Sequence, residues 1–337
     1  GDFEIKVREI TGSPYALGLN SGTAAIHLAL KVVGVGPGDV VIAPTFTYVA
    51  SVSPIIYCGA NPVFIDSERV TWNMDPVLLA KALEELDAKG KRPKAIIVVH
   101  AYGMPADMDA IMPVARKWEI PVIEDAAEAF GATLHGKHMG TVGDLGIYSF
   151  NNNKSITTFG GGILLSSRKE WIERAAFLAT HAREDKPYYE HREIGFNYQI
   201  SPLQAAYGLS QLSGWEKKIA QRRDLYNTYR NALGEFPLEW QEEYKEATSG
   251  RWLTTVRITA SSATDLSEFV DNQDYEIRRV WRPMHSQQVF QGSQTFTLGV
   301  ADYLFGSAVC LPSGPIEAYN FEPFLQWLQY RFKTVFR

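Results

Sequence analysis

The sequence predicts an α/β protein with two units. A large unit, residues 1–220, is expected on a mostly parallel sheet, and a smaller C-terminal α+β unit over residues 221–337. Two observations lead to this prediction. Short β-rich segments alternate with helical patterns through roughly the first two hundred residues, which is typical of a parallel sheet covered by helices. A long helical segment follows, and after it the order of strands and helices changes.

The first half of the chain supplies the elements of the large sheet. Apolar residues at helical spacing predict a helix over 23–33, and the turn at 36–39 leads into a buried strand at 40–43. The other expected elements are strands at 62–66, 95–100, 121–125, 145–150 and 161–167 and helices near 75–89, 107–118 and 169–182. Continuous apolar strands indicate burial on both faces of the sheet.

The second half begins with a helical pattern over 202–233 that is broken at Ser213-Gly214. Such a segment suits a connection between the two units. After it we expect a strand at 251–258, a helix at 262–272 and a closing helix near 317–334. Strands and helices in this order are typical of a smaller α+β domain.

Composition and charge exclude several classes of protein. The chain has 33 Lys and Arg residues against 38 Asp and Glu residues, a formal charge of −5. Binding nucleic acid without sequence preference needs clustered cations, so no nucleic-acid partner is expected. An apolar content of 45% is enough for a large core and argues against disorder.

The cysteines and the lack of long apolar segments indicate a soluble, cytoplasmic protein. Cys58 and Cys310 are too few for a disulfide framework, which fits a reducing compartment. The first ten residues contain no apolar signal core. No apolar run approaches the roughly 18 residues that a transmembrane helix needs, so we expect no membrane partner.

Ser21-Gly22-Thr23 stands directly before the first strong helical pattern. Serine is a favoured N-cap residue, and capping alone would explain the motif. Glycine also allows close backbone approach, and the N–H groups and partial positive charge of a helix N-terminus favour a phosphate. The motif therefore fits either a plain helix cap or a phosphate site.

Other common motifs are absent or stand in the wrong context. GVGPGD at 34–39 follows a helix, leads into a strand and lacks the G-x-G-x-x-G spacing of a dinucleotide loop. Neither a P-loop sequence nor a G-x-S-x-G nucleophile elbow is present. His135 and His138 lie in a probable hairpin with no third ligand nearby, so we expect no metal site.

The most informative residues stand at the ends of two expected strands. Asp125 closes the apolar strand PVIED, and Lys154 follows the strand LGIYSF after three asparagines. In open parallel sheets, sites form at the carboxyl ends of strands. A lysine amine that forms a Schiff base and a carboxylate that keeps a pyridine nitrogen protonated, beside a phosphate-binding helix start, are what pyridoxal phosphate needs. Without these neighbours, Lys154 would be read as a surface residue.

Five segments stand in an order and spacing that a known family shares: SGTAAIHLAL (21–30), GVGPGDVVIAPTFTYVAS (34–51), VIEDAAEAFGA (122–132), YSFNNNKSITTFGGG (148–162) and GFNYQISPLQAA (195–206). Together they resemble the sugar-nucleotide aminotransferases of the DegT/DnrJ/StrS family. The resemblance covers nearly the whole chain. It implies the fold type I, or aspartate aminotransferase-like, architecture and pyridoxal 5′-phosphate as cofactor.

The resemblance also implies a role for each residue around the cofactor ring. Lys154 would form the Schiff base, and Asp125 would pair with the pyridinium nitrogen. Glu128, where many relatives have Gln or His, would approach the 3-oxygen of the ring. Tyr48 would lie against the ring face, with packing in the core as the alternative.

The same resemblance implies which residues hold the phosphate and how the subunits share the sites. Gly22, Thr23 and Ser149 would hold the phosphate, and Asn197 would reach it from a neighbouring subunit. We therefore expect an obligate homodimer in which the sites are shared between subunits.

Three strings narrow the resemblance: FNNNKSITTFGGG, YEHREIGFNYQ (189–199) and WRPMHSQ (281–287). They are most similar to the subgroup that aminates UDP-linked 4-keto-6-deoxy-N-acetylhexoses on the route to bacillosamine-type sugars. Residues in or near these strings could contact the substrate or could equally serve packing. The substrate candidates are Arg183, Tyr189, His191, Trp281 and His285.

The expected reaction moves an amino group from L-glutamate to the C4 keto carbon of a nucleotide-linked 4-keto-6-deoxy sugar, for the synthesis of bacterial surface glycans or glycoproteins. The favoured substrate is UDP-2-acetamido-2,6-dideoxy-hexos-4-ulose, with perosamine-type GDP sugars and dTDP sugars as alternatives. A sugar 3-dehydratase is a rival, but that group has His where this chain has Lys154. A non-catalytic binding or regulatory protein with the same fold is another rival. The joint presence of Thr23, Asp125, Ser149 and Lys154 argues against it.

The sequence departs from the family pattern at three places. Relatives usually have a further segment before the stretch that includes Gly1-Asp2-Phe3-Glu4, so we expect either a missing terminal segment or a site that is open on that side. Gln199 stands where Arg is common, and 156–160 replaces a more usual Gly-Glu-Gly ending. These changes bear on the substrate more than on the cofactor.

Overall fold

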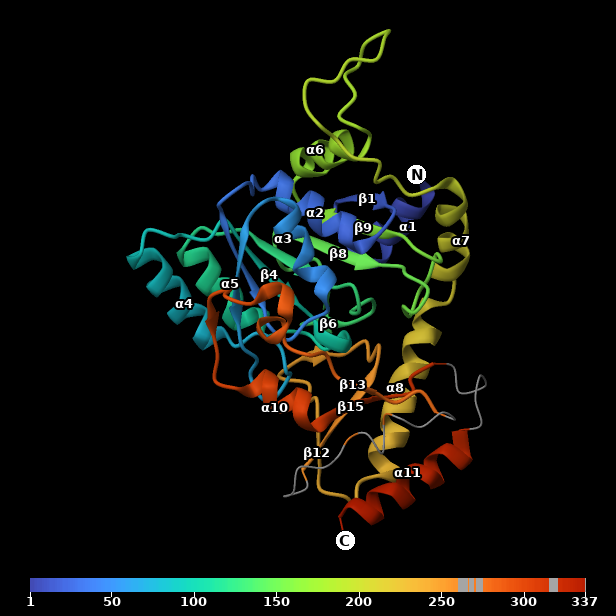
Figure 1. The fold of residues 1–337 in the computed structure, drawn as a ribbon. Helices are drawn as coiled ribbons and strands as arrows, with labels where there is room; N and C mark the ends of the chain where they lie inside the picture. Colours follow the sequence, from blue (N-terminus) through green and yellow to red (C-terminus); the bar gives the residue numbers. More distant parts are fainter. Residues whose placement is uncertain (260–265, 267–269, 271–274, 315–320, 337) are drawn as a thin grey trace.

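The computed structural model describes residues 1–259, 266, 270, 275–314 and 321–336. In this part of the chain the largest sheet has eight strands in the order β1-β9-β8-β5-β4-β2-β3-β14. All neighbouring pairs from β8 to β14 are parallel, and β9 is antiparallel to both of its neighbours. The α/β class with a large, mostly parallel sheet is therefore confirmed (Figure 1).

The six strands that the apolar runs predicted are present to within one residue at each end. Two further strands, β1 and β14, were not predicted. They lie at the two edges of the sheet, where one side is unpaired and a continuous apolar run is not needed. The eight strands are β1 Tyr15–Leu19, β2 Val40–Pro44, β3 Asn61–Ile65, β4 Ala95–Val99, β5 Val122–Asp125, β8 Leu145–Ser149, β9 Gly162–Ser166 and β14 Thr295–Phe296.

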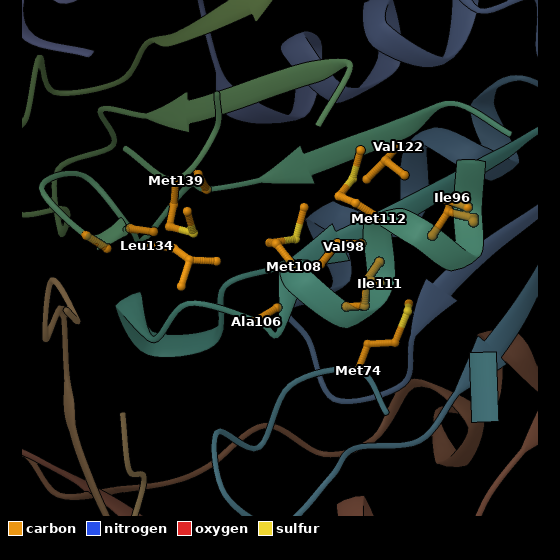
Figure 2. Packing of buried hydrophobic residues seen from close by; sticks show 14 of the residues in the cluster. Met74, Ile96, Val98, Ala106, Met108, Ile111, Met112, Val122, Leu134 and Met139 are labelled. Atoms are coloured by element: carbon orange, nitrogen blue, oxygen red, sulfur yellow. The ribbon is translucent and has the colours of Figure 1, made fainter. Parts of the chain in front are cut away.

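Apolar helix faces cover both sides of the sheet, because alternate residues of a strand point to opposite faces. On one face α2 and α6 pack over the strands, and on the other face α4 and α5 do so. Figure 2 shows side chains of α5 packed against those of β4 and β5, among them Met108, Ile111, Met112, Ile96, Val98 and Val122.

The helices agree with the periodic patterns, with one early ending. The helix expected at 169–182 ends at Ala179, because His181 and Ala182 have φ angles of 63° and 51°, outside the right-handed helical region. The α-helices are α1 Asp2–Thr11, α2 Gly22–Val32, α3 Ser53–Tyr57, α4 Pro76–Ala88, α5 Met108–Lys117, α6 Lys169–Ala179, α7 Pro202–Leu212, α8 Trp215–Ala232, α10 Val300–Ser307 and α11 Phe321–Val335. The described residues also form short 3₁₀ helices, which are η1 Val49–Ser51, η2 Ala101–Gly103, η3 Met284–Ser286 and η4 Gln288–Phe290.

The break expected at Ser213-Gly214 separates α7 from α8, and Gly214 has a left-handed φ of 78°. From there α8 runs toward α11, beside a sheet of order β10-β12-β15-β13 (Figure 1). The proposed division at 220/221 falls inside α8, and β14 joins the large sheet from late in the chain. The four strands are β10 Leu238–Trp240, β12 Thr254–Ile258, β13 Arg278–Arg279 and β15 Ala308–Leu311.

Three elements expected in the second half of the chain have other bounds in the structure or are described only in part. The strand expected at 251–258 begins at Thr254, because Arg251 has a left-handed φ of 47°. The helix expected at 262–272 falls almost wholly outside the described residues. The closing helix is described from Phe321 to Val335 as α11, and 317–320 lie outside the described residues.

The hairpin expected around His135–His138 is confirmed. Strands β6 Thr133–Leu134 and β7 Lys137–His138 pair in antiparallel register, and β11 Ala247–Thr248 joins them. The two turn residues have φ angles of 50° and 75°, as a type I′ turn requires. The His135 ring bonds carboxylates of Asp109 and Glu246, so the hairpin is tied to α5 and to the segment before β11.

The segment between α6 and α7 extends away from the rest of the molecule, as the yellow-green loop in Figure 1 shows. A bridge between Arg183 and His191 holds its base. Tyr189 and Ile194 in this segment are 81% and 86% exposed. Separately, none of the helices in the described ranges is both long and apolar enough to cross a bilayer.

Candidate functional site

A cavity of about 970 Å³ opens at the carboxyl ends of strands in the large sheet. This is the edge at which parallel sheets form their sites. The cavity is within the size range of small-molecule sites. Eight of the residues that the sequence singled out line it together: Gly22, Thr23, Tyr48, Asp125, Glu128, Ser149, Lys154 and Trp281.

One end of the cavity is formed by the first turn of α2. Ser21 caps the helix, with its hydroxyl accepting the Ala24 N–H at 3.0 Å. Gly22 lies so close to the end of β8 that a Cβ there would be 3.1 Å from the Cβ of Ser149. The first turn carries no acidic side chain, so the partial positive charge of the helix end is available to an anion.

Asp125 ends β5 with its carboxylate at the cavity. Oδ2 accepts the Ser51 hydroxyl at 2.5 Å, and Oδ1 accepts the Ala127 N–H at 3.1 Å. Burial raises the pKa of Asp125, while the Ser51 hydrogen bond lowers it. Within the described ranges the structure gives this carboxylate no ion pair within 4.0 Å, so a cation in the cavity beside it would offset the cost of its burial.

Glu124 precedes Asp125 and points to the opposite face, because strand side chains alternate. Its carboxylate accepts N–H groups from Gly140, Val142 and Gly143 and pairs with Nε2 of His100 at 2.9 Å. Nδ1 of His100 accepts the Ala106 N–H, so Nε2 carries the proton of a neutral ring. The end of β5 is thereby fixed from both faces.

Lys154 follows β8 in a short loop, and its side chain is held from two sides. Nζ lies 3.1 Å from Oε1 of Glu128 and 4.0 Å from the ring centroid of Trp252. Trp252 Nε1 donates to the Asn153 carbonyl at 2.8 Å, which ties the loop to the segment before β12. A lysine held in this way presents its amine at one fixed place in the cavity.

Glu128 is 8% exposed and lies between Lys154 and η2. Its Oε2 accepts the Tyr102 N–H at 2.8 Å. Burial raises the pKa of Glu128 to about 7, although the Lys154 charge and the Tyr102 N–H both act to lower it. The negative charge of Asp125 adds to the rise.

Tyr102 connects the large sheet to the C-terminal part of the chain. Its φ of 57° is rare for a bulky residue and places its N–H toward Glu128. Its ring stacks on Trp281 with centroids 4.0 Å apart, and its hydroxyl accepts the Trp281 N–H at 2.9 Å. Gly103 follows with a φ of 89°, where a Cβ would lie 2.9 Å from the Glu128 carbonyl oxygen.

Five predicted site residues do not line this cavity. His285 bonds Thr45 through Nδ1 at 2.7 Å and Asp302 through Nε2 at 3.1 Å, a packing arrangement. Asn197 bridges to Thr180, and its carbonyl accepts the side chain of Asn20. The other three lie in the extended segment between α6 and α7, and they are Arg183, Tyr189 and His191.

Several residues that line the cavity were not predicted from the sequence. Ser51 stands at the end of the quoted segment 34–51, where only Tyr48 was given a role. Trp252 carried no signal, because only the fold brings it to Lys154. The same holds for a set of charged side chains at the cavity, Arg222, Glu276, Arg278 and Arg279.

The sequence of this chain is similar to those of known aminotransferases. A model of the family described as DegT/DnrJ/EryC1/StrS aminotransferase family matches residues 1–317. EpsN of Bacillus subtilis (strain 168), provisionally named a pyridoxal phosphate-dependent aminotransferase, is 44% identical over 318 residues, 93% of this chain and 82% of EpsN. GDP-perosamine synthase of Caulobacter vibrioides is 36% identical over 318 residues, 93% of this chain and 84% of the synthase.

A solved structure shares the fold over almost the whole chain. It is the pyridoxal phosphate form of Spr1654 from Streptococcus pneumoniae, which is provisionally named a sugar aminotransferase. The TM-score is 0.88 at 25% identity, and the match covers 99% of this chain and 90% of Spr1654.

Proposed function

This chain belongs to the DegT/DnrJ/EryC1/StrS aminotransferase family, and from that premise we propose that it transfers the amino group of L-glutamate to the C4 keto carbon of a nucleotide-linked 4-keto-6-deoxy sugar. The family membership makes it a pyridoxal phosphate-dependent sugar aminotransferase. One observation supports the proposal most: Lys154, Asp125 and the first turn of α2 line one cavity.

The residues of the cavity fit pyridoxal phosphate. The uncompensated Asp125 carboxylate suits a cationic ring nitrogen, and the end of α2 with Ser149 suits a phosphate. Val99, Ala127 and Ile147 give an apolar surface for a flat ring. When bound, the cofactor supplies an aldehyde that carries amino groups and a ring that accepts electrons.

Each residue has a role of its own in this proposal. Gly22, Thr23 and Ser149 hold the phosphate, and Tyr48 lies against the ring. Asp125 keeps the ring nitrogen protonated, because a carboxylate beside it favours the charged form and raises the pKa of that nitrogen.

Lys154 serves twice in the proposed reaction. Its amine attaches the cofactor, and once glutamate has displaced it, the free Nζ takes the proton from the α-carbon of the donor. The contacts with Glu128 and Trp252 place this amine beside the rest of the site. The second half of the reaction uses the same amine in the reverse direction to aminate the sugar.

The substrate proposal rests on the space at the open side of the cavity and on the charged side chains that line it. Trp281 offers an aromatic surface, and Arg222, Arg278 and Arg279 line the same space. Cations of this kind suit the diphosphate of a nucleotide sugar. The strings at 189–199 and 281–287 favour UDP-2-acetamido-2,6-dideoxy-hexos-4-ulose, used for surface glycans or glycoproteins.

A GDP-linked 4-keto-6-deoxymannose is the second candidate substrate. The 36% identity to GDP-perosamine synthase over 93% of this chain favours it. Both substrates carry a keto group at C4 beside a 6-deoxy carbon, so the cofactor end of the site would serve either. The residues at the open side of the cavity would decide between the two nucleotides.

We further propose a homodimer with shared sites. Large apolar side chains near the cavity and on the extended segment are exposed to solvent in the single chain, among them Phe159 at 72%, Leu203 at 81% and Ile194 at 86%. Exposed apolar side chains of this size favour burial against a second copy. In such a dimer, Asn197 would reach the phosphate of the partner's site. A cytoplasmic location is proposed as well, since Cys58 and Cys310 are both free thiols.

The substrate is tested by product mass. The loaded protein is incubated with L-glutamate and a panel of UDP-, GDP- and dTDP-linked 4-keto-6-deoxy sugars, and Lys154→Ala is the matched control. We expect the mass of the 4-amino sugar from the UDP-N-acetyl substrate. An amino product from the GDP sugar alone would establish the second candidate, and no product from any sugar would contradict the proposed function.

A further inference from the structure

The ion pair of Glu128 and Lys154 is buried, and both oxygens of the carboxylate are used. Nζ lies 3.1 Å from Oε1, and the two side chains are 6% and 13% exposed. The Tyr102 N–H donates to Oε2 at 2.8 Å. A buried pair of this kind is favourable only while both partners are charged, because losing one charge leaves the other buried and uncompensated.

Among the described residues, the titratable groups that interact with Glu128 each come from a different element: Lys154 after β8, Asp125 on β5, Tyr102 in η2 and Cys310 on β15. Lys154 is the only cation among them. Burial raises the pKa of Tyr102 and also that of Cys310, the latter to about 12, so both stay uncharged near neutral pH. Asp125 adds a negative charge. Glu128 therefore depends on the charge of one lysine.

That lysine loses its charge in the proposed function, on which the present inference rests. An amine that bonds an aldehyde carbon must first become neutral. Both side chains are largely buried, and Oε1 of Glu128 already accepts a hydrogen bond from Nζ. The shortest path for the proton is along that hydrogen bond.

We propose that Glu128 takes up the proton that Lys154 loses when its amine bonds the aldehyde carbon of pyridoxal phosphate, and returns it only when the cofactor leaves the site. Glu128 is then an uncharged acid in the loaded enzyme and a carboxylate in the free enzyme.

The atoms and charges balance. The ammonium of Lys154 carries three protons: two leave with the aldehyde oxygen as water, and the third moves to Glu128. A carbon–nitrogen double bond replaces the carbon–oxygen double bond. One positive and one negative charge disappear together, so the buried site stays neutral throughout. A neutral side chain of the same shape at position 128 would also suit the loaded state, but it could not store the proton.

The proton balance of cofactor loading tests this directly. Pyridoxal phosphate is added to the cofactor-free protein in weakly buffered solution, and the protons released are counted for the wild type and for Glu128→Gln. At about pH 8 the variant is expected to release about one proton more than the wild type. The difference should vanish at about pH 6, because Glu128, with a pKa of about 7, is then already protonated in the free enzyme. Protons that belong to the cofactor itself cancel in this comparison.

Infrared difference spectra provide a second readout that needs no turnover. Loading the wild type at about pH 8 should produce the carbonyl band of an un-ionised carboxyl group, and this band should be absent in Glu128→Gln. Equal proton release by the two proteins at both pH values, with no such band, would overturn the proposal. The visible absorption that pyridoxal phosphate gains on attachment to lysine is recorded in parallel. If the wild type lacked it, the cofactor assignment itself would be contradicted, which is a different failure.

Discussion

The two sides of the cavity differ in how completely one chain builds them. At the cofactor end, Asp125, Glu128 and Lys154 are almost fully buried, and each has defined partners. At the open side, the side chains of Arg278 and Glu276 are 75% and 73% exposed. This difference teaches that the fold of one chain positions Asp125, Glu128 and Lys154, whereas the open side, where we propose that the sugar binds, is lined by exposed side chains.

The largest expected effect comes from removing the amine at the cofactor end. Lys154→Ala should lower turnover with L-glutamate by at least about 10⁴-fold, because the attachment point and the proton-transfer group are lost together. The rate of oxoglutarate formation measures this, and circular dichroism checks the fold. Wild-type turnover by the variant would end the assignment of Lys154.

Asp125→Asn should have the next largest effect. An amide cannot compensate a cationic ring nitrogen, so turnover should fall by roughly 10²–10³-fold. The substitution also removes a buried charge that has no ion-pair partner within 4.0 Å in the described part of the chain, so the fold should be retained or stabilised. Thermal unfolding of the cofactor-free protein measures the effect on stability separately from the effect on turnover. A variant that keeps full activity would show that this carboxylate is not needed at the ring.

Much of the cofactor end could be predicted from the sequence because its residues stand at strand ends and within contiguous segments. Asp125 and Lys154 follow apolar strands, and the Ser21-Gly22-Thr23 motif precedes a helix. Their meeting in one cavity follows from the parallel order of the sheet.

What could not be predicted depends on contacts between distant segments. Trp252 reaches Lys154 across 98 positions of sequence, and Tyr102 reaches Glu128 by its backbone N–H, which no side-chain pattern records. His285 was a candidate for the substrate, but the fold places its ring between Thr45 and Asp302. Edge strand β14, with two residues, is too short to leave a periodic signal.

A smaller and more specific effect is expected at Ser51, which supports Asp125 from behind. In Ser51→Ala the carboxylate loses the hydroxyl that donates at 2.5 Å, so its charged form is less favoured and the pKa of Asp125 rises further. Turnover should fall by about tenfold, and the acid limb of the pH–rate profile should move to higher pH. Ser53→Ala, which removes a hydroxyl that donates to the Val49 carbonyl, is the matched control. An unmoved acid limb would separate Ser51 from Asp125.

The smallest effect is expected at the open side of the cavity. Arg278→Ala should leave the visible spectrum of the loaded enzyme and its reaction with L-glutamate unchanged, and raise KM for the nucleotide sugar by about tenfold. Arg168→Ala, which removes a 51% exposed side chain outside the cavity, is the control. If Arg278→Ala altered the glutamate reaction instead, the two sides of the cavity would not be independent as described.

The central claim is that one amine, Nζ of Lys154, carries the cofactor. The most direct measurement reduces the pyridoxal phosphate-loaded protein with borohydride, digests it and locates the retained cofactor mass by peptide mass spectrometry. We expect one modified peptide, containing Lys154. Modification of a different lysine, or no retained cofactor mass at all, would contradict the account.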